Sequence, residues 1–255
     1  MISYSRFIEI LSHHISNSDD FLDDLLKTVI TNPNRYCGIF RLSDAKTKLI
    51  QNVTQSKEIK FGDFMEDIIT EYLGLAGYQN MPKNIGKNKE GDELNVDQLF
   101  VLGKTLFLIE QKIRDDHDST KKRGQFDNFE KKVRLVRTQY PEFHIDASMW
   151  FIDNSLVKNK KYYIDCIKNL SVPNSTIGVF YGETLFNHLN HPEIWIDLVS
   201  NLKQLHNSNN HSSVIIPDFD TSPEILSALI HLDKKLWNKL PENKKIIQKL
   251  RQFIR

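Results

Sequence analysis

Residues 95–112, NVDQLFVLGKTLFLIEQK, decide the fold that we expect for this chain. They predict two strands joined by a tight turn. The first strand begins with an acid, Asp97, and the second is apolar until it ends in Glu110, Gln111 and Lys112. An apolar strand of this kind is typical of a buried sheet, and its charged end indicates that the sheet opens there on a polar site. Because side chains alternate along a strand, Glu110 and Lys112 lie on the same side.

The elements around this hairpin predict an α/β fold. After residue 112 the pattern runs helix, strand, helix, strand, helix, which indicates a partly parallel sheet covered on both faces. The hairpin adds antiparallel strands, so we expect a central mixed β-sheet flanked by helices. Residues 82–91, PKNIGKNKEG, predict a loop, either a solvated connection or a contact to backbone phosphates. We expect two helices within 2–31, a short strand within 37–42, helices over 62–76, 121–140 and 160–170, and strands over 147–152 and 176–181.

The two ends of the chain predict helical extensions. Ser222-Pro223-Glu224 is a strong helix start, and it predicts a helix over 225–240, with a last helix after Pro241. We divide the chain into an N-terminal helical extension (1–60), a core (61–190) and a C-terminal helical extension (191–255), which together form one compact domain.

Composition narrows the class of protein. With 255 residues the chain can bury a sizeable core. Its formal net charge of +1 argues against non-specific coating of nucleic acid but leaves a specific DNA-binding protein open. The two cysteines, Cys37 and Cys166, form no Cys-x-x-Cys pair, so we expect no cysteine-rich zinc site. The sequence shows neither a signal peptide nor a membrane span, so we expect a cytoplasmic protein with no membrane partner.

Asp97, Glu110 and Lys112 are the candidate catalytic residues. Phosphodiester hydrolysis needs an activated water, a neutralised phosphate and a stabilised leaving oxygen, and Mg²⁺ can serve all three needs. Mg²⁺ prefers carboxylate and carbonyl oxygens, which Asp97, Glu110 and the backbone carbonyl of Gln111 would supply. The ammonium of Lys112 would orient the water and offset negative charge. The alternative is a structural salt bridge at the strand end, because an acid two residues before a lysine also occurs elsewhere in the chain.

This constellation resembles the PD-(D/E)XK nuclease superfamily and, within it, type II restriction endonucleases. The resemblance covers about residues 60–190, with Asp97, then Glu110-Gln111-Lys112, then a basic helix and two strands. It departs from the motif in having Val96 before the first acid. The resemblance implies Mg²⁺-dependent cleavage of double-stranded DNA by a homodimer, with a separate methyltransferase that protects host DNA. It also implies that Glu66, on the leading helix, assists the metal site. A repair or junction-resolving nuclease and a non-catalytic DNA-binding module are the alternatives.

The segment after Lys112, IRDDHDSTKKRGQFDN, is the candidate DNA-reading segment. Arg pairs well with guanine, and Asn or Gln with adenine, in the major groove. The alternative is a solvated charged face. The candidate DNA-binding residues are Arg114, Ser119, Thr120, Lys121, Lys122, Arg123, Gln125 and Asn128.

Overall fold

The computed structural model describes residues 1–15, 18–36, 42–87, 91, 93–113, 119–208 and 221–239, without the side chains of residues 15, 18–21 and 119. The chain divides into two compact units. Unit 1 comprises Met1–Ile10 and Phe61–Asn209, and unit 2 comprises Leu11–Lys60 and Asn210–Arg255.

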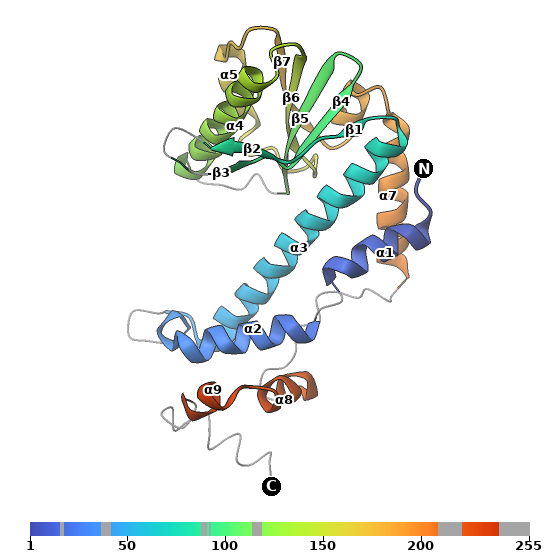
Figure 1. Cartoon of the computed structure of the whole chain (residues 1–255). Coiled ribbons are helices and arrows are strands. Elements are labelled where there is room, and N and C mark those ends of the chain that lie inside the picture. The colour runs from blue at the N-terminus through green and yellow to red at the C-terminus, as the bar shows by residue number, and fades with distance from the viewer. Residues whose placement is uncertain are drawn as a thin grey trace. The chain divides into compact units, whose positions relative to one another are not determined.

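Figure 1 labels the helices and strands. The helices are α1 (Tyr4–Ile15), α2 (Ser18–Thr31), α3 (Ala45–Leu75), α4 (Ser119–Gln139), α5 (Lys160–Asn169), α6 (Thr184–His188), α7 (Pro192–Asn207), α8 (Pro223–Ile230), α9 (Lys234–Lys239) and the 3-10 helix η1 (Pro33–Arg35). The strands are β1 (Gln79–Asn80), β2 (Asn84–Lys87), β3 (Glu93–Asn95), β4 (Gln98–Leu102), β5 (Thr105–Lys112), β6 (His144–Phe151) and β7 (Ser175–Tyr181).

Unit 1 is built on a mixed sheet with the strand order β1-β4-β5-β6-β7. β4 and β5 form the expected antiparallel hairpin, whereas β5, β6 and β7 run parallel. Parallel neighbours need a crossover connection, and α4 and α5 supply the two crossovers. The expected α/β class with a central mixed sheet is therefore confirmed.

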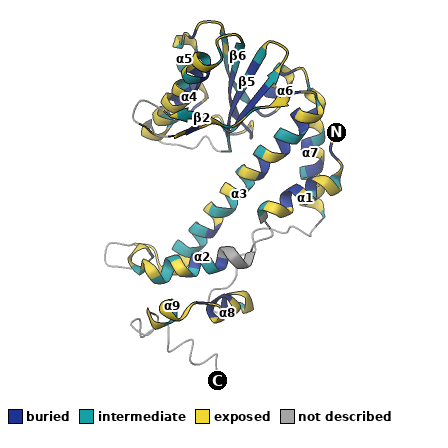
Figure 2. Cartoon of the chain, viewed as in Figure 1, coloured by how far each residue is buried: buried dark blue, intermediate teal, exposed yellow. Residues whose placement is uncertain are grey.

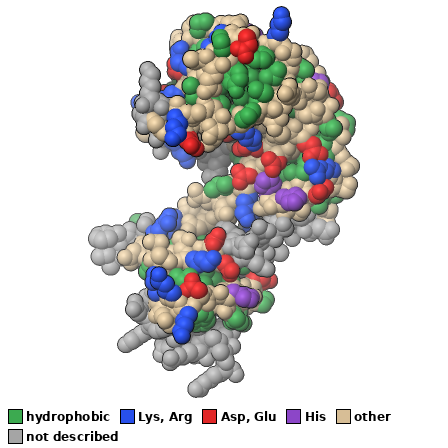
Figure 3. Space-filling view, viewed as in Figure 1, with side chains coloured by type: hydrophobic (Ala, Val, Ile, Leu, Met, Phe, Trp, Pro, Cys, Tyr) green, Lys and Arg blue, Asp and Glu red, His purple; other side chains and the backbone are tan. Residues whose placement is uncertain are grey.

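Helices cover both faces of this sheet (Figure 1). On one face, Phe129 of α4 and Tyr163 of α5 belong to the same buried cluster as Leu108 of β5. On the other face, Trp150 of β6 packs edge-on against Phe186 of α6, with ring centroids 5.4 Å apart. Figure 2 shows buried residues along β5 and β6 and on the inward helix faces, and Figure 3 shows hydrophobic side chains gathered over the sheet of unit 1. Burial on both faces explains why β5 and β6 read as nearly continuous apolar runs.

The strand β2 corrects the prediction of a loop over residues 82–91. Residues Asn84–Lys87 pair antiparallel with β3. Ile85 is buried in the core of unit 1, and its carbonyl accepts a hydrogen bond from Gln139 Nε2 at 2.6 Å. One buried isoleucine among Lys, Asn and Gly residues was too weak a pattern to indicate a strand.

Helix α3 begins earlier than the expected residue 62. It starts at Ala45, and the carboxylate of Asp44 accepts a hydrogen bond from the Thr47 N–H at 2.7 Å. This side-chain bond satisfies one of the unpaired N–H groups at a helix start. The first half of α3 has few apolar residues at helical spacing, so the sequence alone did not show it.

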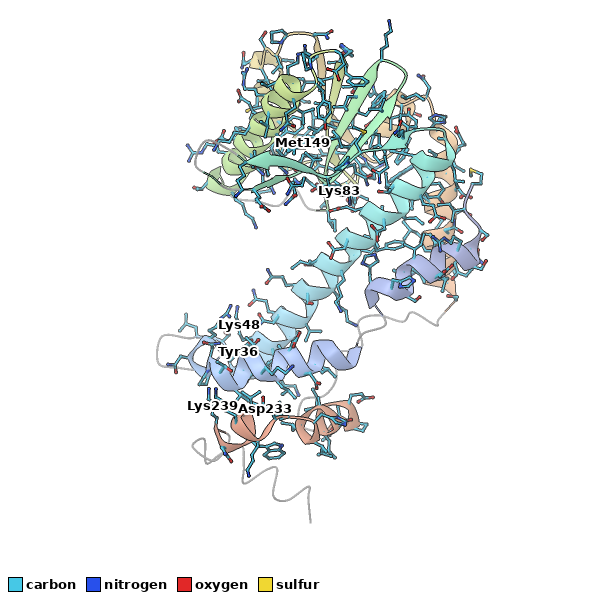
Figure 4. All side chains as sticks on the ribbon, in the orientation of Figure 1. Tyr36, Lys48, Lys83, Met149, Asp233 and Lys239 are labelled. Atoms are coloured by element: carbon cyan, nitrogen blue, oxygen red, sulfur yellow. The ribbon has the colours of Figure 1, made fainter. Side chains whose placement is uncertain are left out.

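In unit 2, the helix expected over 225–240 is broken. Helix α8 ends at Ile230 and α9 spans Lys234–Lys239, and Figure 4 labels Asp233 and Lys239 at the two ends of α9. Asp233 accepts a hydrogen bond from the Leu236 N–H at 2.9 Å, so it starts a new helix rather than continuing the old one. Helix α8 packs on α2 through Leu22, Ile225 and Leu229.

Two expected elements, the short strand within 37–42 and the helix after Pro241, fall almost wholly outside the described residues. Among the residues that are described, no helix is both long and apolar enough to cross a membrane.

Gly77 ends α3 in a left-handed conformation, with φ of +91°. The Tyr78 N–H reaches back to the Leu73 carbonyl at 3.0 Å, as in a glycine-capped helix end. We expect Gly77→Ala to lower the free energy of unfolding by about 1–2 kcal/mol, because a side chain disfavours this backbone conformation. Urea denaturation would measure the change.

Gly74, in the last turn of the same helix, is the matched control. A Cβ meets nothing within 4 Å at either glycine, so crowding does not distinguish them. We expect Gly74→Ala to raise the free energy of unfolding by about 0.5–1 kcal/mol, because alanine is the better helix former. Equal effects at both positions would contradict the assigned role of the cap.

Candidate functional site

Asp97 lies at the head of β4, as the sequence predicts, and the backbone of β5 holds its side chain. Its Oδ2 accepts a hydrogen bond from the Gln111 N–H at 2.7 Å. The hairpin register places Gln98 opposite Ile109, which brings the start of β4 beside the end of β5. The position of the Asp97 carboxylate therefore follows from strand pairing.

Glu110 and Lys112 lie at the end of β5 and contact each other. Lys112 Nζ donates to Glu110 Oε2 at 3.0 Å and lies 3.3 Å from Asp97 Oδ2. It also donates to the backbone carbonyl of Gln111 at 3.0 Å. The side chain of Glu110 is only 3% exposed, whereas those of Lys112 and Asp97 are 20% and 22% exposed. The structure thus brings the three candidate catalytic residues together, with the more exposed groups facing outward.

Three oxygens converge on the Lys112 ammonium, and they form a set that suits Mg²⁺. They are Asp97 Oδ2, Glu110 Oε2 and the Gln111 carbonyl, all within 3.3 Å of one cation. Two carboxylates and a carbonyl are the hard ligands that Mg²⁺ prefers. Within the described residues no three His, Cys, Asp or Glu side chains gather to hold a metal. A metal here would therefore rely on the backbone carbonyl as well as the two acids.

Burial and charge shift the pKa values of these groups. Burial, followed by the nearby charge of Glu110, raises the pKa of Asp97 against the opposing effect of Lys112. Burial lowers the pKa of Lys112, but the carboxylates of Glu110 and Asp97 outweigh it, so its pKa is raised. Each ion therefore depends on its neighbours, since an isolated buried charge is costly.

Lys132 of α4 also contacts the site, and the sequence analysis did not single it out. Its Nζ donates to Glu110 Oε1, and its side chain is 7% exposed. The signal was present in the sequence: Lys132 lies three residues after Phe129 and four before Val136, on the apolar stripe. A lysine on a buried stripe requires a buried anion.

Glu66 of α3 lies close enough to Asp97 for the two charges to interact, but its ion-pair partner is Lys83. Lys83 Nζ lies 2.8 Å from Glu66 Oε2. Figure 4 labels Lys83, which belongs to unit 1 as Glu66 does. Burial raises the pKa of Glu66, Lys83 opposes the rise, and Asp97 adds to it. Glu66 is therefore placed beside the site rather than among its three oxygens.

Gln98 is a second residue that the sequence analysis did not single out. It is fully buried, and its Nε2 donates to the Glu66 carbonyl at 2.9 Å while its Oε1 accepts from Thr70 at 3.1 Å. These bonds tie β4 to α3 directly after Asp97. Gln111 makes a similar link from β5, donating to the Gly62 carbonyl at 3.2 Å.

The candidate DNA-binding residues fall into three groups. Arg114 lies outside the described residues, as does the side chain of Ser119. Lys122 and Gln125 are partly buried: Lys122 Nζ lies 4.7 Å from the Tyr162 ring centre, and Tyr163 donates to Gln125 Oε1 at 2.9 Å. The remaining residues lie exposed on α4, and they are Thr120, Lys121, Arg123 and Asn128.

Comparison with known proteins identifies a family. A family model described as "Type II restriction endonuclease, HinfI" matches two overlapping stretches, residues 3–88 and 75–206. Searches of curated proteins and of solved structures find no match. The matched stretches include Glu66, Asp97, Glu110, Lys112 and Lys132.

Proposed function

The chain belongs to the HinfI family of type II restriction endonucleases, and we propose on this basis that it cuts double-stranded DNA at a short specific sequence. The proposed reaction is Mg²⁺-dependent hydrolysis of a phosphodiester bond. Further parts of the proposal are a PD-(D/E)XK catalytic site, a homodimer that acts in the cytoplasm, and a separate methyltransferase that protects host DNA. The observation that supports the proposal best is that Asp97, Glu110 and the Gln111 carbonyl all contact the ammonium of Lys112.

In the proposed mechanism, the residues of β4 and β5 bind the metal and the substrate phosphate. Asp97, Glu110 and the Gln111 carbonyl would hold Mg²⁺. A bound Mg²⁺ would lower the pKa of the attacking water and neutralise charge on the phosphate. Lys112 would leave the three oxygens, orient the water and stabilise the negative charge that develops on the phosphate. Its three donors and its position at the edge of the site suit it to this role.

The exposed residues of α4 are proposed to contact DNA. Lys121 and Arg123 follow β5 closely in the chain, and both are exposed. Contacts to phosphates would position the duplex, and contacts to base edges would provide sequence specificity. Asn128 is the exposed candidate for reading adenine.

The test is to incubate the protein with unmethylated phage DNA, with and without Mg²⁺, beside an Asp97→Ala variant. We expect discrete fragments only with Mg²⁺ and with Asp97 present. Addition of a chelator should stop cutting, because it removes the Mg²⁺ that would activate the water and neutralise charge on the phosphate.

Other outcomes would reject the proposal. Cutting of branched or damaged DNA but not of linear duplex would replace it with a repair or junction-resolving nuclease. DNA binding without cutting of any substrate would indicate a binding module whose charges at the end of β5 are structural. Cutting without any metal would show that Asp97, Glu110 and the Gln111 carbonyl do not act as metal ligands in the reaction.

A further inference from the structure

We propose that Lys132 is a positioning residue of the site, which fixes the carboxylate of Glu110 so that Lys112 can leave it for the substrate. The proposal rests on the proposed function. Lys132 lies on α4, outside the hairpin that carries Asp97, Glu110 and Lys112.

The burial of Lys132 follows from its place on α4. Phe129, Val133 and Val136 form the buried face of this helix, and Lys132 lies on the same face. The neighbouring Lys131 is exposed. Lysine is almost never fully buried without a partner. The partner here is Glu110, which β5 presents from the sheet on which α4 packs.

The two oxygens of Glu110 go to two different lysines. Oε1 accepts from Lys132, and Oε2 accepts from Lys112 at 3.0 Å. Lys112 also contacts Asp97 and the Gln111 carbonyl, and it is partly exposed. Lys112 can therefore move outward, whereas Lys132 is enclosed at the base of the site.

This division of roles matters because Glu110 Oε2 would have to give up its hydrogen bond from Lys112 in order to bind a metal. Lys132 then remains as the counter-charge of Glu110 and keeps the carboxylate in the same orientation. Without Lys132, both oxygens of Glu110 would turn to Lys112. That would hold Lys112 in the site and present Oε2 in the wrong direction. Because Lys132 is buried, it acts through Glu110 rather than on DNA.

The experiment compares Lys132→Met with Lys131→Met, the same change at the exposed neighbouring position. Mn²⁺, which prefers the same oxygen ligands, is titrated into each protein without DNA, and free Mn²⁺ is measured by electron paramagnetic resonance. We expect the Mn²⁺ dissociation constant of Lys132→Met to rise about 10- to 100-fold, the range for partners that orient metal ligands. We expect kcat for cleavage to fall by a similar factor with KM for DNA unchanged. Lys131→Met should leave Mn²⁺ binding and kcat at the wild-type values.

If Lys132 served only as a counter-charge, its replacement would change the Mn²⁺ affinity in the opposite direction. Loss of one positive charge beside the carboxylates would tighten Mn²⁺ binding, so unchanged or tighter binding in Lys132→Met overturns the proposal. If the wild-type protein neither binds Mn²⁺ nor cuts DNA, the proposed function is rejected as well. If the wild-type protein cuts DNA and the Lys132→Met variant cuts equally fast, only the role of Lys132 is rejected.

A second variant keeps the test valid if Lys132→Met does not fold. Glu110→Gln combined with Lys132→Met leaves no buried unpaired charge, so it should fold where the single variant fails. If Lys132 acts through Glu110, Mn²⁺ binds the double variant as weakly as it binds Glu110→Gln alone. A further, multiplicative loss in the double variant would show that Lys132 acts independently of Glu110, against the proposal.

Discussion

Replacing Lys112 by alanine is expected to reduce the rate of DNA cleavage by about 10²- to 10³-fold, the range for loss of one positioned donor that stabilises developing negative charge. DNA affinity should change little, because one side chain of 20% exposure contributes little to a phosphate-contact surface. Single-turnover cleavage at saturating Mg²⁺ would measure the rate, and a gel-shift titration would measure the affinity.

The same variant should also be stabilised by Mg²⁺ more than the wild type is. In the wild type, the Lys112 ammonium contacts all three proposed metal ligands. Its removal leaves those oxygens to Mg²⁺, so we expect Mg²⁺ to raise the melting temperature of Lys112→Ala more than that of the wild type.

Lys104→Ala is the control for this experiment, because Lys104 is an exposed lysine just before β5, at the opposite end of that strand. We expect it to cut at the wild-type rate and to respond to Mg²⁺ as the wild type does. Cleavage by Lys112→Ala at the rate of Lys104→Ala would exclude Lys112 from the mechanism.

Replacing Trp150 by alanine is expected to lower the free energy of unfolding by about 3–5 kcal/mol. Its side chain is fully buried, packs edge-on against Phe186 and Trp195, and donates a hydrogen bond from Nε1 to the Gly182 carbonyl at 2.9 Å. The variant would leave a large cavity and an unpaired carbonyl. Urea denaturation followed by circular dichroism would measure the loss.

Trp195→Ala is the comparison for Trp150→Ala. Trp195 belongs to the same aromatic group but is only partly buried, so its removal should cost less than half as much. Equal losses in the two variants would contradict the assignment of Trp150 to the centre of this face.

Strong local patterns explain what the sequence could predict. The β4–β5 hairpin follows from an apolar strand with charged residues at its end, and the parallel strands follow from alternation with helices. The sequence also predicted that Asp97, Glu110 and Lys112 lie together, and the structure places them in contact. Their catalytic roles remain proposals.

Two of the features that were missed depend on contacts between separate elements, and the third depends on a local helix cap. Lys132 carries a charge that marks a solvated face in most helices, and only the packing of α4 shows that it meets Glu110. Gln98 bridges to α3 through backbone and side-chain groups that no sequence pattern encodes. The break between α8 and α9 depends on one capping aspartate, which the apolar pattern on both sides obscured.

The hydrogen bonds that hold the carboxylates of Asp97 and Glu110 join residues that are near one another along the chain. They span 14 positions from Asp97 to Gln111 and 22 positions from Glu110 to Lys132. By contrast, the bond from Tyr72 to Asp197, which ties α3 to α7, spans 125 positions. Short loops cost the least entropy to close, so the site is expected to assemble early as the chain leaves the ribosome.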